Sequence, residues 1–350
     1  YIFFYSRVYF KTYNCRDIDF KMNILITGGA GFIGSHLSEL LIKNNKISKV
    51  IVIDHLLDGS KKNLKNILKD KKFSLIKADI CNHKSIDKYF RNAHYVFHLA
   101  AIADIVPSII NPKEYILTNF MGTINVLESA RKHKIKKIIY AASSSCYGKT
   151  PKKPINENFR ISTLYPYSFS KNIAEQAIIH WSKIYKLNFI SLRLFNVFGT
   201  RSRTTGAYGA VMGVFLKQKL SKKPFTVVGN GKQTRDFIYV SDIAKVFEKS
   251  AFSNKKNEIY NVGTGKPQSV LYLTKLLKGK KIHIPKRPGE PDFLRADISK
   301  IKQQLNWNPK ISFEDGVNLL VKDIDYWRSA PLWNASKIKK ATKNWFKNLR

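Results

Sequence analysis

A tyrosine and a lysine four residues apart, Tyr167 and Lys171, are the side chains whose types and spacing best suit acid–base chemistry. Residues four apart lie one above the other on the same face of a helix. A phenol with a pKa near ~10 is a poor base at neutral pH, but a neighbouring ammonium group stabilises the phenolate and lowers that pKa. The pair therefore predicts a general base for a hydroxyl proton. The alternative is an exposed pair on a helix surface.

A run of three hydroxyl side chains, Ser143, Ser144 and Ser145, follows an apolar segment at residues 137–142. Hydroxyl groups at the end of a strand can hydrogen-bond a sugar hydroxyl and relay its proton. Small polar residues at such a position also form turns and helix caps. The run is therefore a second candidate for the same chemistry, with a structural alternative.

A glycine-rich turn near the start of the chain fits the pattern of a dinucleotide-binding turn. It follows an apolar run and precedes leucines at helical spacing, and its glycines are Gly28, Gly29, Gly31 and Gly34. Glycine permits the tight turn, the approach of the backbone to a diphosphate, and close packing of helix on strand. The diphosphate would lie at the N-terminus of the helix that begins near Phe32, where free N–H groups point at it.

A second apolar run, at residues 50–53, ends in Asp54, twenty residues after Gly34. A carboxylate at this place accepts hydrogen bonds from the adenosine ribose hydroxyls and repels a 2′-phosphate. The spacing therefore predicts NAD rather than NADP as the cofactor. The alternative is a solvated acid that ends a strand.

Short apolar runs alternate with helical patterns from residue 22 to about residue 185. The predicted strands are residues 24–26, 50–54, 73–76, 95–101, 137–142 and 189–193, and one of the helical patterns between them is residues 118–133. This alternation predicts an α/β fold, a doubly wound parallel (Rossmann) sheet with helices on both faces. Ligands of such sheets bind beyond the carboxyl ends of the strands, where the unusual residues are found.

Beyond Asn196 the alternation gives way to frequent glycine and proline, which predicts a smaller, loop-rich C-terminal substrate domain. We expect an NAD-binding domain at residues 22–190, with returning segments near 235–262, and an interleaved substrate-binding domain at 191–330. The many basic residues among residues 331–350 predict a basic helix on the surface. Residues 1–21 lack periodicity and a signal-peptide pattern, so we interpret them as a non-native or disordered extension.

The formal charge of +38 comes from lysines scattered over nearly every segment. Scatter of this kind is typical of a solvated surface and argues against a specific nucleic-acid site, although the positive field favours a doubly negative substrate. Three widely spaced cysteines, Cys15, Cys81 and Cys146, give neither a disulfide framework nor a metal site. No apolar run is long enough to span a membrane. We therefore expect a cytoplasmic protein with no metal and no membrane partner.

Several motifs occur together, in one order and at one spacing. They are Thr27-Gly28-x-x-Gly31-x-x-Gly34, His98-Leu99-Ala100-Ala101, Asn119-Phe120-Met121-Gly122-Thr123, Ser143 with Tyr147-Gly148, Tyr167-x-x-x-Lys171, Phe195-Asn196-Val197-Phe198-Gly199 and Arg287-Pro288-Gly289-Glu290. As a set they are specific, and over roughly residues 22–325 the chain resembles the extended short-chain dehydrogenase/reductase family, the NAD-dependent nucleotide-sugar epimerases and dehydratases.

The resemblance implies roles for individual residues. Tyr167 would be the general base, Lys171 would lower its pKa and hold the nicotinamide ribose, and Ser143 would bond the reacting sugar hydroxyl. The implied cofactor-binding residues are Gly28, Gly31, Phe32, Ile33, Gly34, Asp54, Asn63, Asp79, Ile80, Leu99, Ala100, Ala101, Asn119, Tyr167 and Lys171. The implied substrate-binding residues are Ser144, Ser145, Asn196, Arg235, Arg287, Glu290 and Leu294. Of these, Asn196, Arg235 and Arg287 would hold a diphosphate, and Glu290 the nucleoside ribose.

The residues beside Ser143 favour one reaction over the others that the family carries out. In the family, 4,6-dehydratases have an Asp-Glu pair directly after the first hydroxyl residue, and UDP-glucuronate decarboxylases have a glutamate where Ser145 stands. Ser144 and Ser145 cannot act as acids, and the segment is similar to that of UDP-glucose and UDP-N-acetylglucosamine 4-epimerases. We therefore expect a UDP-hexose 4-epimerase that inverts C4 through a 4-keto intermediate, with hydride passing to and from bound NAD.

Other interpretations stay open. Leu294 is intermediate in size where the family adjusts the room beside the sugar 2-substituent, so plain and acetylated hexoses are both candidates. Another nucleotide sugar, a UDP-uronate or a GDP-, CDP- or dTDP-sugar, could be epimerised, decarboxylated or dehydrated. From a different class, the chain could be a non-catalytic NAD- or RNA-binding relative, which the intact Ser143, Tyr167 and Lys171 disfavour. The resemblance also implies a homodimer through helices near residues 111–133 and 170–185.

Overall fold

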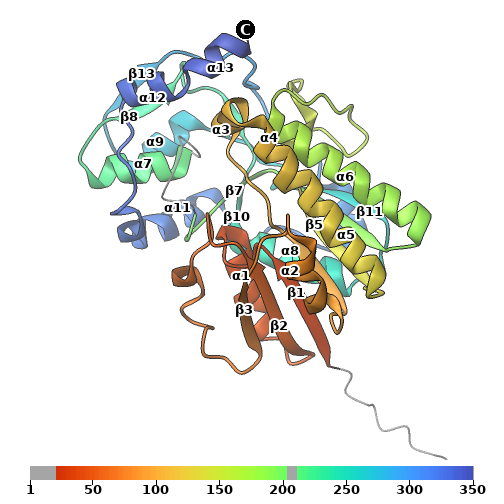
Figure 1. Cartoon of the computed structure of the whole chain (residues 1–350). Helices are drawn as coiled ribbons and strands as arrows, with labels where there is room; N and C mark the ends of the chain where they lie inside the picture. The colour runs from red at the N-terminus through yellow and green to blue at the C-terminus, as the bar shows by residue number, and fades with distance from the viewer. Residues whose placement is uncertain (1–20, 203–210, 350) are drawn as a thin grey trace, which may run out of the picture.

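The computed structural model describes residues 21–202 and 211–349, and a parallel sheet of seven strands runs through it (Figure 1). The strand order is β11-β6-β5-β4-β1-β2-β3. The strands are β1 (Met22–Thr27), β2 (Ile47–Asp54), β3 (Phe73–Lys77), β4 (Tyr95–His98), β5 (Lys137–Ser143), β6 (Phe189–Leu194) and β11 (Glu258–Val262). The predicted doubly wound α/β fold is confirmed, and the seventh strand comes from the predicted returning segment near residues 235–262.

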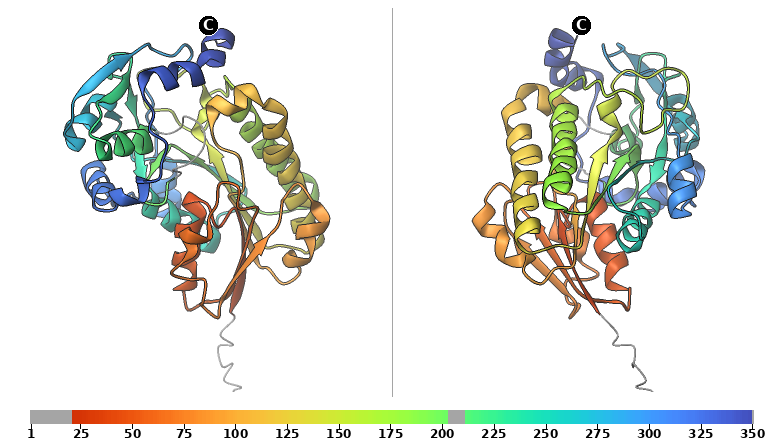
Figure 2. Two further views of the ribbon diagram at one scale, coloured as in Figure 1. Left: turned by 60° about the vertical axis from the view of Figure 1, so that its left-hand side comes forward. Right: turned by 90° about the vertical axis from the view of Figure 1, so that its right-hand side faces the viewer.

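Side chains alternate between two cores on the two faces of the sheet, as the pleat of a strand requires. On β1, Ile24 and Ile26 lie in one core and Leu25 in the other. Helices α1 (Phe32–Ile42) and α8 (Val240–Phe252) pack on the first face. Helices α5 (Gly122–Lys132) and α6 (Pro166–Tyr185) lie side by side over the second (Figures 1 and 2). Both faces are thus covered, which explains why the strands read as continuous apolar runs.

Two segments depart from the predicted boundaries. The predicted fourth strand ends at His98, because Leu99, Ala100 and Ala101 leave the sheet as a loop that lines a cavity. The predicted helix at 118–133 begins earlier, in a π-helical segment, and then continues as α5. The short elements around these are η1 (Lys61–Leu64), α2 (His83–Ile86), η2 (Asp87–Phe90), α3 (Ile105–Ile110), α4 (Pro112–Tyr115), η3 (Ile116–Met121) and η4 (Ser144–Tyr147).

A smaller part with a separate hydrophobic core lies beyond the carboxyl ends of the strands. Its strands form three pairs, which are β7 (Asn196–Phe198) with β10 (Phe237–Tyr239), β8 (Phe225–Val228) with β13 (Lys281–Ile284), and β9 (Thr234–Arg235) with β12 (Gln268–Ser269). Helices α7 (Val211–Leu220), α9 (Val270–Leu277), α11 (Phe313–Lys322) and η5 (Ile324–Trp327) pack in this part, whereas α10 (Ser299–Leu305) packs against β11 of the large sheet. The chain leaves the sheet after β6 and returns to it for α8 and β11, so the two parts interleave.

The C-terminal segment differs from the single basic surface helix that the sequence predicts. It forms two short helices, α12 (Ala335–Ala341) and α13 (Lys343–Asn348), and α13 packs against α3. Ile338 and Trp345 are buried, while the lysines of the segment are exposed. The prediction was wrong because it was based on the many lysines in the composition of this segment. The packing of the segment depends instead on three buried positions with the spacing of one helix face, residues 338, 342 and 345. The predicted extension at residues 1–21 and Cys15 lie outside the described residues, except for the exposed Lys21.

Candidate active site

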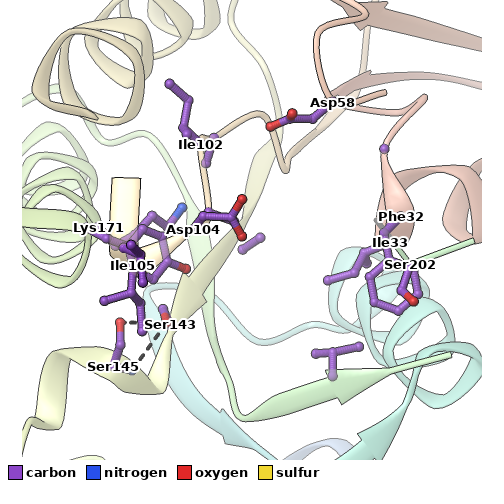
Figure 3. A pocket seen from close by; sticks show the side chains of 18 of the residues that line it. Phe32, Ile33, Asp58, Ile102, Asp104, Ile105, Ser143, Ser145, Lys171 and Ser202 are labelled. Atoms are coloured by element: carbon purple, nitrogen blue, oxygen red, sulfur yellow. Dashed lines mark hydrogen bonds between the residues drawn. The ribbon is translucent and has the colours of Figure 1, made fainter. Parts of the chain in front are cut away.

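One cavity of about 1870 Å³ opens at the carboxyl ends of the parallel strands and extends to the smaller part of the structure. Its walls are the glycine-rich turn, the ends of β2, β4, β5 and β6, the start of α6, and the loop around residues 287–294. Every residue predicted to bind cofactor or substrate lines it, apart from Asn119. In Figure 3, Ser143, Ser145 and Lys171 gather at one side, and Phe32 and Ile33 lie at the other. The structure thus brings the two sets of predicted residues into one site.

The glycine-rich turn packs so closely against backbone atoms that there is no room for a side chain at Gly28 or Gly34. Gly28 has a φ of +73°, and a Cβ there would lie 2.6 Å from the backbone nitrogen of Ala100. A Cβ on Gly34 would collide with the carbonyl oxygen of Gly28. Helix α1 starts at Phe32, and no side chain caps its N-terminus. The free N–H groups of its first turn therefore form an anion site at the wall of the cavity.

Asp54 is not the solvated strand end that the sequence left open, since only 8% of it is exposed. Its carboxylate accepts hydrogen bonds from the backbone nitrogens of Ala30, at 2.9 Å, and Leu56, at 2.8 Å. Asn63 donates to the carbonyl oxygen of Ala30 at 3.0 Å and accepts from the Tyr326 hydroxyl. Burial raises the pKa of Asp54, and these backbone N–H groups oppose that. The acid thus braces the turn while it lines the cavity.

Ser143, at the end of β5, and Tyr167, in the first turn of α6, meet at the floor of the cavity. The Tyr167 phenol and the Ser143 hydroxyl are hydrogen-bonded. Ser143 also caps η4 by accepting from the backbone nitrogen of Ser145, and its hydroxyl lies 2.8 Å from that of Ser145 (Figure 3). The structural alternative for the serine run is therefore confirmed, since Ser143 is a helix cap. Its role toward a sugar hydroxyl stays a prediction, for which the contact with Tyr167 is a suitable geometry.

Lys171 lies beneath the same floor and is only 4% exposed, which excludes a pair on the helix surface. Its ammonium nitrogen sits 4.2 Å from the ring centroid of Tyr140. Burial lowers the pKa of Lys171 to about 7, although the neighbouring Glu175 carboxylate raises it. Burial also raises the pKa of Tyr167, and the hydrogen bond with Ser143 opposes that. The structure therefore does not show the lowering of the Tyr167 pKa by Lys171 that the sequence predicts, because burial raises that pKa and only the hydrogen bond with Ser143 opposes the rise.

Asp104, on the loop after β4, is a cavity residue that the sequence analysis did not single out. It lies at the same end of the cavity as Lys171 and Ser143 (Figure 3). Its negative charge contributes to the raised pKa of Tyr167. No local pattern marks this acid, because it reaches the tyrosine only through the position of the loop.

Asn119 holds the cavity wall from behind rather than lining it. It is 1% exposed, and its amide exchanges hydrogen bonds with both backbone groups of Ile102 and donates to the Ser170 hydroxyl. It thereby ties the loop after β4 to helix α6. His98 has a similar role, since its ring nitrogens lie 2.7 and 2.8 Å from the hydroxyls of Thr27 and Thr123. Burial lowers the pKa of His98 to about 3, so the ring is neutral at physiological pH.

The sequence analysis also did not predict a buried ion pair next to Lys171, between Glu175 and Arg193. Glu175, four residues after Lys171 on α6, accepts from the Arg193 guanidinium at 2.7 and 3.1 Å and from the Ser191 hydroxyl at 2.6 Å. The side chains of the pair are 2% and 4% exposed. Arg193 donates in addition to the Tyr147 hydroxyl and to the carbonyl oxygen of Glu157. The pair thus joins α6 to β6 directly below the lysine.

The far end of the cavity holds the residues predicted to bind a diphosphate. Glu290 lies between two arginines, 2.9 Å from the Arg235 guanidinium and 3.8 Å from that of Arg287. Asn196 also lines this region, and its buried side-chain oxygen has no hydrogen-bond partner among residues 21–202 and 211–349. Two guanidinium groups and an amide are suited to the oxygens of a diphosphate. Leu294 lines the cavity and is buried.

Within the part of the chain that the structure describes, no helix is long and apolar enough to cross a membrane.

Comparison with known proteins gives the family. Residues 25–320 match the family described as GDP-mannose 4,6 dehydratase. A putative UDP-glucose 4-epimerase of Methanocaldococcus jannaschii is 38% identical over 307 residues, which cover 85% of this chain and 97% of that relative.

Two solved structures are similar to this one. The UDP-N-acetylglucosamine 4-epimerase from Methanobrevibacter ruminantium M1, in complex with UDP-N-acetylmuramic acid, has a TM-score of 0.82 and 32% identity over 88% of this chain and 98% of its own. The UDP-glucuronic acid 4-epimerase from Bacillus cereus, in complex with UDP-glucuronic acid and NAD, has a TM-score of 0.81 and 31% identity over 88% of this chain and 99% of its own. Together with the glycine-rich turn and the Ser143, Tyr167 and Lys171 cluster, these matches show that the chain belongs to the GDP-mannose 4,6-dehydratase family of extended short-chain dehydrogenases/reductases, the nucleotide-sugar epimerases and dehydratases.

Proposed function

We propose that this enzyme is a UDP-hexose 4-epimerase with NAD as its cofactor. The observation that carries the proposal is the cluster of Ser143, Tyr167 and Lys171 in one cavity with two serines, Ser144 and Ser145, beside it. Dehydration and decarboxylation in this family use an acid beside the first hydroxyl residue, and a serine cannot supply one. The 4-epimerases among the relatives support the same choice.

The residues around the glycine-rich turn fit NAD. The uncapped start of α1 offers N–H groups to a diphosphate, and a Cβ at Gly28 or Gly34 would fill the space that the turn keeps close to its neighbours. Asp54 places a carboxylate at the end of β2, where it suits ribose hydroxyls and repels a 2′-phosphate. Asp79 and Ile80 would flank the adenine of the cofactor, and Ala100 would lie beside its nicotinamide half.

Tyr167 would take the proton of the sugar 4-hydroxyl while Ser143 holds that oxygen by a hydrogen bond. Bound NAD would supply the hydride acceptor and donor for C4, and the positive charge of its nicotinamide would favour the phenolate of Tyr167. The Lys171 side chain would donate a hydrogen bond to the ribose of the cofactor. When Lys171 is protonated, its positive charge would also favour the phenolate of Tyr167. Because Tyr167 is fixed on α6, the 4-keto sugar must turn to present its other face before the hydride and proton return. A cavity of about 1870 Å³ leaves room for that turn.

Arg235, Arg287 and Asn196 would hold the diphosphate, with Glu290 joining the two arginines and reaching the nucleoside ribose. An uncharged hexose is favoured over a uronate because the negative charge of Asp104, which acts on Tyr167, would also repel a sugar carboxylate. Epimerisation of a UDP-uronate is the second candidate, supported by the similarity to the Bacillus cereus enzyme.

The proposal is tested by NMR of the purified full chain with UDP-galactose, UDP-N-acetylgalactosamine and UDP-galacturonate, without added NAD. Conversion of UDP-galactose to UDP-glucose, faster than conversion of the uronate, supports it. If only the uronate is epimerised, the second candidate replaces the first. If none of the three reacts although NAD is released from the denatured protein, the UDP-4-epimerase proposal is wrong.

Replacing Gly28 by alanine should remove bound NAD. The positive φ and the approach to Ala100 both forbid a Cβ, so the turn must move away from the diphosphate position. The matched control is Gly289→Ala, because Gly289 has a similar φ of +74° but open space around it. NAD released from each purified variant on denaturation is the measurement. Equal NAD content in the two variants would contradict the account.

Replacing Lys171 by methionine should remove a pH dependence of stability from the NAD-free protein. The folded pKa of Lys171 is lowered to about 7, against 10.5 without burial. Between these values the unfolded chain binds more protons than the folded one, so this residue makes wild-type stability rise with pH from about 7 to 10. Urea unfolding of wild type and variant at several pH values gives the difference. A difference that stays flat across this range would show that the lysine keeps an ordinary pKa.

We also propose a homodimer through α5 and α6. Leu117 and Met121 of η3 and Phe169 of α6 are 44–48% exposed, and η3 and α6 pack together. Large apolar side chains grouped on one face are typical of an interface. Light scattering of the purified chain should therefore give twice the chain mass of 40.3 kDa.

A further inference from the structure

The two C-terminal helices lie beyond the part of the chain that matches the family, which ends at residue 320. The C-terminal segment nevertheless reaches the cavity, because Trp345 of α13 lines it together with Pro331 and Trp333, which precede α12. The buried side of the segment is made by Ile338, Thr342 and Trp345, which belong to or adjoin the core of the smaller part. This chain therefore has an additional wall of the site, built from sequence outside the matched region.

Trp345 contacts the loop that carries Arg287. Its indole nitrogen donates to the carbonyl oxygen of Pro288 at 2.7 Å. The Arg287 guanidinium carbon lies 5.6 Å from the centroid of the indole, within the range of a cation–π contact. The indole also packs against the ring of Tyr165, at 5.6 Å between centroids, two residues before Tyr167. One side chain thus joins the arginine loop to the start of the catalytic helix.

The Arg287 guanidinium lies 3.8 Å from the Glu290 carboxylate, and the indole of Trp345 adds a second contact to it. The loop lies outside every helix and strand and contains Gly289, which has a positive φ and open space around it. A long side chain on a loop loses conformational freedom when it binds an anion, and a contact that orders it beforehand reduces that loss. The Pro288 hydrogen bond fixes the backbone, and the indole face fixes the guanidinium.

We propose that the segment from Pro331 to Trp345 forms part of the nucleotide-sugar site and that Trp345 is a positioning residue, which holds Arg287 ready for the substrate diphosphate. This rests on the proposed function, in which Arg287 binds that diphosphate. The exposed lysines of the segment, such as Lys343 and Lys347, take no part in it. The basic segment is therefore a substrate-site element rather than a nucleic-acid contact.

The test compares Trp345→Leu and Trp345→Phe with a control in the same helix, Lys343→Ala/Lys347→Ala. Trp345→Leu should weaken UDP binding and raise KM for UDP-galactose by about 5- to 10-fold, the size of a partly buried cation–π contact. The kcat should stay within about twofold, because the variant leaves the reacting end unchanged. Trp345→Phe keeps a ring for the guanidinium but loses the hydrogen bond to Pro288, so its KM should lie between those of wild type and Trp345→Leu. The lysine control should match wild type.

Two further measurements separate positioning from general damage. Uridine, which has no phosphate, should bind wild type and Trp345→Leu equally in titration calorimetry. In an Arg287→Ala background, Trp345→Leu should cost no further UDP affinity, since both changes remove the same interaction. Equal loss of uridine and UDP, additive losses in the double variant, or an unchanged UDP affinity in Trp345→Leu would each overturn the proposal. UDP titration needs no turnover, so failure of the epimerase assay alone would count against the proposed function and not against this inference.

Discussion

Replacing Tyr167 by phenylalanine should lower kcat for epimerisation by roughly 10²- to 10⁴-fold, the usual contribution of a positioned general base. The variant loses only the phenol oxygen, which is hydrogen-bonded to Ser143 at the cavity floor. The ring, its edge-on contact with Tyr115 at 6.4 Å and the start of α6 all remain. NAD content and UDP affinity should therefore stay close to wild type while turnover is lost.

Tyr115→Phe is the matched control for this variant. It removes the same atom from the neighbouring ring, where the hydroxyl donates to the backbone oxygen of Asp104 and does not face a reacting atom. We expect less than about a tenfold change in kcat for it. Initial rates with UDP-galactose at saturating concentration distinguish the two. If both phenylalanine variants retain similar activity, another group is the base.

Replacing Glu175 by leucine should destabilise the fold by about 3–5 kcal/mol, because it leaves Arg193 buried without its counter-charge. The carboxylate accepts three of the short hydrogen bonds below the active site, from two nitrogens of Arg193 and from Ser191. It also raises the pKa of Lys171, so the same variant should lower that pKa further. Chemical denaturation of the purified variant measures the first effect.

Two control variants show whether the loss of stability comes from the orphaned buried charge. Asp325→Leu removes an acid from an exposed pair with Arg328 and should leave the stability near wild type, because surface ion pairs contribute little. Glu175→Leu/Arg193→Leu removes both buried charges and should recover part of the loss, since no orphaned charge remains. A double variant less stable than Glu175→Leu would show that packing rather than charge holds α6 on β6.

The fold and much of the site could be predicted because their signals are local. The central strands β1, β4, β5 and β6 are largely buried on both faces and therefore appear in the sequence as apolar runs. The positive φ at Gly28 is also indicated by its residue type. The i, i+4 spacing of Tyr167 and Lys171 was likewise enough to place them on one helix. Asn119 shows the limit of a motif, because it matched the pattern while its amide serves the loop at Ile102.

What the sequence did not indicate depends on contacts between distant segments. Asp104 acts on Tyr167 from another loop, and Arg193 meets Glu175 only because β6 lies beside α6. Trp345 reaches a loop 57 residues away, in a segment whose lysines suggested a solvated helix. The lysines that dominate the composition of this segment lie on its exposed side, whereas the buried Trp345 determines where the segment packs on the rest of the structure.

In the proposed reaction, hydride leaves C4 of the sugar and returns to the same carbon on the other face. UDP-galactose carrying deuterium at C4 tests it most directly when it is converted by the purified full chain in ordinary water and followed by NMR. The account predicts UDP-glucose that keeps its deuterium at C4, because the hydride never exchanges with solvent. Product with hydrogen at C4, or no conversion by protein that holds NAD, would contradict it.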